Sequence, residues 1–153
     1  MNKTQERDQK LQELNIELTK KRNDIKRRKD AIALQKLNDL MAEDDAYCDA
    51  KRKKIAEIDA VRLEKSTYEV TDPLYTLCET KARSMEHQLS LLRNEHERNI
   101  HRISNRHMIA RTALDDEDRE LSEWQEEQKA AIMRDFMERK DTDDANEAQH
   151  EAE

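Results

Sequence analysis

One proline in a chain without glycine is the feature that most constrains the fold. None of the 153 residues is glycine, and Pro73, which follows Asp72, is the only proline. Proline lacks a backbone N–H and disfavours helical backbone in the residue before it, whereas Asp at an N-cap followed by Pro at the first helical position often starts a helix. The stretch from Val70 to Leu74 therefore predicts a break between two helices, with Asp72 as the cap of the second helix.

The composition is typical of long helices. Charged residues make up 42% of the chain, hydrophobic residues 35% and aromatic residues 3%, a profile that favours a coiled coil over a globular domain. Strands and tight turns usually need glycine, proline or β-branched runs, and these are nearly absent. We therefore expect an all-α fold without a compact core.

The first helix is expected over residues 3–69, with a turn over 70–72. Asn2 and Gln5 form a loose capping-box signal, and no residue type forbids a helix from there to about Tyr68. Its expected seam, the line of side chains along which two helices pack, consists of Leu11, Leu14, Leu18, Ile25 and Ile32, followed in a shifted phase by Leu37, Met41, Cys48, Ile55 and Ile58. The spacing is that of a coiled coil, and the shift predicts a stutter near residues 34–37.

The second helix is expected over residues 73–140 and has a similar stripe. The stripe consists of Leu77, Met85, Leu89, Leu92, His96, Ile103, His107, Ala110, Leu114, Leu121, Trp124 and Ala131. Residues 141–153 then form an acidic segment, which we expect to be a disordered, solvated tail in the isolated chain.

Charge predicts that the two helices run antiparallel. If the chain folds about Asp72, facing residues have numbers that sum to about 144, and acidic stretches then lie opposite basic ones, a pattern that sets orientation in coiled coils. The matched stretches are 26–29 with 115–118, 20–22 with 120–126, and 43–45 with 98–102. Residues 1–140 are therefore expected to form a long antiparallel two-helix coiled-coil hairpin. The alternative is one long helix kinked at Pro73 within an oligomeric coiled coil, because no glycine is present to cap the first helix.

The sequence lacks the patterns of a catalytic, cofactor or metal site. His96 and His101 are five residues apart, which places them about 140° apart around a helix, so one zinc ion cannot readily bind both. A chain without glycine cannot form a glycine-rich phosphate loop. Two paired helices also enclose no pocket. We expect a protein that is not an enzyme and that uses no cofactor or metal.

Two surfaces are candidates for binding. The densest apolar patch is typical of Met-rich helix ends that dock protein partners, and it consists of Trp124, Ile132, Met133, Phe136 and Met137. A basic band is formed by Lys51, Arg52, Lys53, Lys54, Arg98, Arg102 and Arg106. The band has no interleaved aromatic residues for base stacking, and the chain has a net charge of -7, so contact with nucleic acid is the weaker interpretation.

The expected surroundings are intracellular. No apolar run approaches the roughly 20 residues of a membrane span, and the first residues have no signal-peptide core. We expect no membrane contact, and a location in the cytoplasm or in an assembly built inside a cell, such as a virion. Cys48 and Cys78 suit a reducing compartment, and we expect both to be packed without an intrachain disulfide.

A structural role follows from these patterns. Charged residues interrupt the seam, so the hairpin is marginal alone and self-association or protein partners are expected. The leading hypothesis is a rod-like coiled-coil subunit that bridges or spaces components of a virion, secretion or motor complex. The alternative is a nucleic-acid-associated or packaging protein that uses the basic band. In architecture alone, such a hairpin resembles the stalk proteins of type III export ATPases and some phage assembly proteins, and no motif assigns the chain to either family.

Overall fold

The chain folds into two helices joined by one turn. The structure is a computed structural model that describes the backbone of residues 2–152 and the side chains of residues 2–139. Helix α1 spans Lys3–Lys65 and helix α2 spans Pro73–Ala152. The model is 94% helical and has no strands among the residues it describes. The expected all-α hairpin is confirmed, and the alternative of one long kinked helix is wrong.

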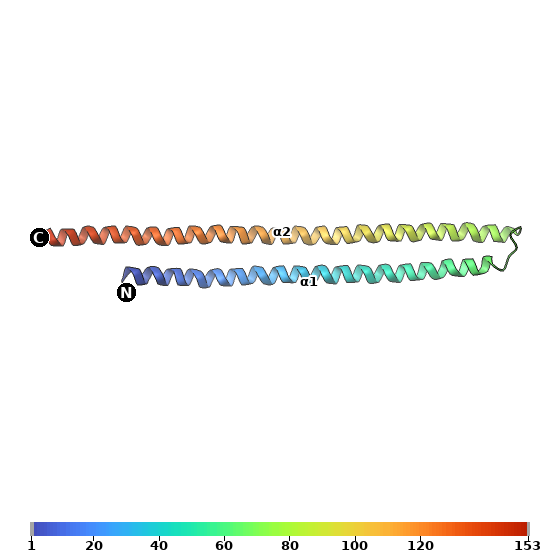
Figure 1. Cartoon of the computed structure of the whole chain (residues 1–153), viewed down its shortest axis with the longest axis horizontal. Coiled ribbons are helices and arrows are strands. Elements are labelled where there is room, and N and C mark those ends of the chain that lie inside the picture. The colour runs from blue at the N-terminus through green and yellow to red at the C-terminus, as the bar shows by residue number, and fades with distance from the viewer. Residues whose placement is uncertain (1, 153) are drawn as a thin grey trace. The chain divides into compact units, whose positions relative to one another are not determined.

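The helices are divided between two compact units. Unit 1 comprises residues 1–31 and 110–153, and unit 2 comprises residues 32–109. In each unit a stretch of α1 packs against a stretch of α2 that runs in the opposite direction (Figure 1).

Both helices begin with the caps that the sequence predicts. The backbone N–H of Gln5 donates to Asn2 Oδ1 at 2.8 Å, and that of Asn2 donates to Gln5 Oε1 at 3.1 Å, which is a reciprocal capping box. At α2, the N–H of Leu74 donates to Asp72 Oδ1 at 2.9 Å, and Pro73 occupies the first helical position. These bonds satisfy N–H groups that have no partner inside the helix.

Helix α1 ends at Lys65, earlier than the expected residue 69, so the turn covers 66–72 rather than 70–72. The hydroxyl of Ser66 donates to the carbonyl of Leu63, and that of Thr67 donates to the carbonyl of Glu64, both at 2.6 Å. No residue in the described part of the chain has a positive φ. Carbonyl groups in the last turn of α1 thus accept hydrogen bonds from two hydroxyls. These bonds explain how the helix ends without the glycine that is common at helix C-termini.

Helix α2 continues to Ala152, whereas the sequence analysis expected it to end at residue 140. The acidic segment contains no glycine or proline, and alanine, glutamate and glutamine are good helix formers, so nothing local ends the helix there. The expected disorder of residues 141–153 in the isolated chain stays a prediction.

The seam of unit 1 agrees with the apolar stripe predicted for it. The buried side chains are Leu14, Leu18 and Ile25 from α1 and Leu114 and Leu121 from α2. Leu18, Ile25 and Leu121 form one cluster, and Trp124 packs against it. Ala131 is exposed instead of buried, and the neighbouring Ile132 is half-buried.

Ion pairs between the helices confirm the predicted register in unit 1. Lys29 Nζ lies 2.9 Å from Asp115 Oδ1, and Arg28 Nη2 lies 2.6 Å from Glu117 Oε2. The hydrogen bond from Lys29 lowers the pKa of the Asp115 carboxyl. In the second predicted match, Arg22 lies opposite α2 as expected, but it donates to the amide of Gln125 at 3.2 Å rather than pairing with an acid.

The seam of unit 2 differs from the prediction. Of the shifted-phase residues on α1, only Ile58 is buried; Leu37, Met41, Cys48 and Ile55 are exposed. On α2, Leu77 is exposed and the adjacent Cys78 is buried beside Val61 and Ala82. The predicted stutter is therefore wrong. Continuing the seven-residue step from Ile25 and Ile32 leads to Asp39, which contacts α2 and lies closer to the true seam.

Candidate functional site

The seam of unit 2 contains a polar cluster around Glu43. Glu43 Oε1 lies 3.1 Å from His96 Nδ1 and accepts a bond of 3.0 Å from the side-chain amide of Asn99. The ring of Tyr47 stacks on His96 with centroids 4.1 Å apart and an interplanar angle of 7°. The third predicted charge match therefore has the correct position but another partner, because Glu43 contacts His96 and Asn99 rather than the arginines at 98 and 102.

A second polar cluster surrounds Asp39. Its Oδ2 atom lies 2.9 Å from His107 Nε2 and 3.3 Å from Arg106 Nη2, while its Oδ1 atom accepts a 2.8 Å bond from the Gln35 amide. These bonds, the one from His107 first, hold the pKa of the Asp39 carboxyl below its ordinary value. The His107 residue is 8% exposed. A buried imidazole needs such an acceptor, which explains why α1 turns carboxylates towards α2 here.

The two clusters link α1 to α2 through side-chain hydrogen bonds. A groove beside Glu43 and His96 has a volume of about 190 Å³, smaller than the roughly 300 to 1,000 Å³ of usual ligand pockets. An open groove of about 510 Å³ in unit 1 lies beside Trp124, whose ring is covered by Lys21 Nζ at 3.8 Å. Among the described residues, no group of three or more His, Cys, Asp or Glu side chains is placed to hold a metal ion.

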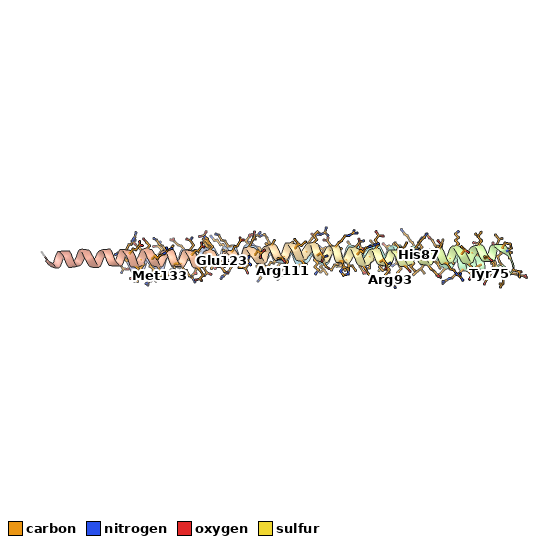
Figure 2. All side chains as sticks on the ribbon, turned by 90° about the horizontal axis from the view of Figure 1, so that it is seen from above. Tyr75, His87, Arg93, Arg111, Glu123 and Met133 are labelled. Carbon is orange, nitrogen blue, oxygen red and sulfur yellow. The ribbon has the colours of Figure 1, made fainter. Side chains whose placement is uncertain are left out.

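The apolar patch predicted in unit 1 has two sides. Trp124, Ile132 and Phe136 are half-buried; Trp124 packs on the seam cluster, and the guanidinium of Arg7 lies 4.6 Å from the centre of the Phe136 ring. Met133, labelled in Figure 2, is 41% exposed, and Met137 is 50% exposed. Only the two methionines are thus available to a partner while the hairpin is closed.

The residues of the basic band all belong to unit 2, and several are already paired. Acidic side chains lie within 3.5 Å of Arg52, Lys54 and Arg106. Arg102 donates to the Asn99 side chain at 3.3 Å, and Lys51 Nζ lies 5.9 Å from the centre of the Tyr47 ring. Lys53 and Arg98 are exposed.

A surface that the sequence analysis did not identify lies on α1 in unit 2. Five side chains on one face of α1, four of them assigned to the seam by the sequence, are exposed instead, and we call them the outer stripe: Leu34, Leu37, Met41, Cys48 and Ile55. Their spacing of three, four and seven residues was visible in the sequence. That spacing shows that they share a face, but it does not show which neighbour the face has.

Comparisons with protein-family models, with curated proteins and with solved structures give no match for this chain. In the part of the chain that the structure describes, neither helix contains a stretch long and apolar enough to cross a membrane.

Proposed function

We propose that this chain is a non-enzymatic structural or assembly protein, whose coiled-coil hairpin bridges or spaces components of a larger complex. The outer stripe is the observation that carries the proposal, because α2 leaves this face uncovered. Apolar residues at spacings of three, four and seven are what one helix needs to pack along another. Exposed apolar faces of this kind mark interaction surfaces.

The thin seam supports the same proposal. No described side chain is fully buried, and in unit 2 the seam includes Asp39, Glu43 and His107 among its contacts. Burial of one Leu or Ile contributes about 1.5 to 3 kcal/mol, whereas ordering the backbone costs about 1 to 2 kcal/mol for each residue. A hairpin with so few buried side chains is stabilised by additional contact with protein.

Met133 and Met137 supply a second contact surface, in unit 1. Both are exposed on α2 next to side chains that pack on α1. Methionine is flexible and polarisable, which suits it to apolar docking surfaces. We assign these two residues to binding a partner protein of the complex.

Cross-linking mass spectrometry of the chain in the cells that make it tests the proposal. The expected result is a small set of partner proteins linked at reproducible positions. The variant M133E/M137E should lose the links near residue 137 while keeping its helical circular dichroism. Ile16→Glu, also at an exposed apolar position of unit 1, is the matched control and should keep them. A chain that migrates alone in native extracts, without reproducible links, would contradict the proposal.

Nucleic-acid packaging by the basic band is not favoured, because Lys54 and Arg106 already have acidic partners and the chain has a net charge of -7. If the band bound DNA or RNA, affinity would fall steeply with salt, since each neutralised phosphate releases counterions. A titration of the purified chain with duplex DNA and single-stranded RNA at several salt concentrations measures this directly.

A further inference from the structure

We propose that the outer stripe binds a second copy of this chain, which docks on it antiparallel about a two-fold axis at Cys48. The inference rests on the proposed function, in which the stripe is a helix-packing surface, and it names the partner. The apolar stripe by itself does not identify its occupant. The charged residues beside the stripe identify the occupant.

The outer stripe is narrow and faces away from α2. With a helical rotation of about 100° per residue, its five side chains fall within about 60° of one another. Three α1 residues that contact α2 in this unit, Asp39, Glu43 and Tyr47, lie about 105° to 175° from the centre of the stripe by the same rotation. A second helix can therefore lie along the stripe without displacing α2.

Charged residues flank the stripe in a self-complementary order. Asp44 and Asp45 precede Cys48, and Lys51 and Arg52 follow it; all four side chains are exposed. The helical rotation places Asp44 and Lys51 on one side of the stripe, and Asp45 and Arg52 on the other side. On each side of the stripe, one acid thus precedes Cys48 and one base follows it.

A two-fold axis at Cys48 brings opposite charges together on both sides. In an antiparallel pair, each flank of the stripe faces the same flank of the second copy. Asp44 then meets the partner's Lys51, and Asp45 meets the partner's Arg52, with the reciprocal pairs formed by symmetry. A parallel pair in register would instead place Asp44 near the partner's Asp45 and Lys51 near the partner's Arg52, and like charges so placed are unfavourable. The charge order therefore selects an antiparallel second copy.

The three stripe residues centred on Cys48 fit the same axis, whereas Leu34 and Leu37 lie opposite the partner's Arg62 and Asp59. Met41 lies opposite the partner's Ile55, and Cys48 lies opposite the partner's Cys48. For packed helices with axes 8 to 10 Å apart and Cα atoms about 2.3 Å from each axis, facing Cα atoms are roughly 3.5 to 5.5 Å apart. Disulfide-linked cysteines usually have Cα atoms about 4.4 to 6.8 Å apart. Cross-linking through Cys48 can thus report the axis.

Single-cysteine chains test the geometry. In purified full-length C78S protein, mild oxidation at micromolar concentration should give a covalent dimer through Cys48. The variants M41C/C48S/C78S and I55C/C48S/C78S should cross-link to each other, but neither should cross-link efficiently to itself. Position 41 lies about 21 Å along the axis from its own symmetry mate, at 1.5 Å per residue. Efficient self-linking of the position-41 variant would show a parallel pair and overturn the proposal.

Charge exchange tests the energetic basis. In sedimentation equilibrium, D44K/D45K should weaken the dimer about tenfold, because exposed ion pairs are replaced by like charges. Adding K51D/R52D to that variant should restore the affinity, since the order of charges is then reversed as a whole. M41E/I55E should abolish the dimer with the helical signal unchanged, whereas M108E/I109E, at exposed apolar positions on α2 of the same unit, should not.

Failure of this inference is distinguishable from failure of the proposed function. A purified chain that stays monomeric at all concentrations, or a full charge exchange that does not restore the dimer, overturns self-docking. Neither result bears on links to other proteins in cells, which test the broader proposal.

Discussion

Alanine substitutions at Ile58 and Met41 distinguish the two apolar faces of α1 by their energetic effect. Ile58 is 4% exposed and Met41 is 56% exposed. Ile58→Ala removes three buried carbon groups at about 0.8 kcal/mol each, or roughly 2.5 kcal/mol. This lies near the lower end of the usual range for such changes, since two helices can partly close the cavity. Met41→Ala should change the free energy of unfolding by less than about 0.5 kcal/mol, because the side chain is largely solvated and alanine favours helix.

Urea unfolding followed by far-UV circular dichroism measures both values. The experiment is best done in the D44K/D45K background at low protein concentration, so that self-docking does not contribute. An unchanged dependence on urea concentration would show that only stability has changed. Met108→Ala, at an exposed position on α2 of unit 2, is the matched control. If Met41→Ala cost as much as Ile58→Ala, Met41 would belong to the seam and the outer stripe would not exist.

Three further outcomes are expected. The bonds of Asp39 to His107 and Gln35 lower its pKa in the folded protein, so its stabilisation is present above the pKa of the unfolded carboxyl, about 3.9, and is lost as the pH falls through the folded pKa. Asp39→Asn should therefore make the urea concentration at the unfolding midpoint fall less steeply at acid pH, and an unchanged slope would refute this. Asp72→Ala should cost about 1 kcal/mol by removing the cap of α2, while Asp72→Asn should be nearly neutral; equal losses in urea unfolding would argue against the cap. Cys48, which is exposed, should react with a thiol reagent at low protein concentration much faster than the buried Cys78, and equal rates would contradict the burial.

The parts of the fold that could be predicted depend on local chemistry or on charge. Asp72 and Pro73 start α2 as expected, since a cap and a fixed φ act within one turn of helix. The register of unit 1 followed from the charges of residues 26–29 and 115–118, and Arg28 and Lys29 do pair with Glu117 and Asp115. The early end of α1 was missed because the hydroxyls of Ser66 and Thr67 cap the helix where no glycine marks its end.

The candidate binding surface could be predicted only in part. The spacing of Leu37, Met41 and Ile55 correctly indicated a common face, but that face was assigned to the seam. The signal for the true seam was present, because the seven-residue step from Ile32 leads to Asp39. A carboxylate is not expected in an apolar seam unless it has a polar partner. That partner, His107, was identified only in the structure.

The sequence alone determined that this protein is helical, where its second helix begins and that the helices run antiparallel, because glycine content, capping residues and charge order act through the chain itself. Only the tertiary structure decided which face of α1 meets α2 in unit 2. An apolar stripe specifies that a helix face needs a neighbour, but not which neighbour. Buried His107 and half-buried His96 need acceptors, and only the face that carries Asp39 and Glu43 supplies them. The face of α1 that carries the outer stripe is therefore left uncovered by α2.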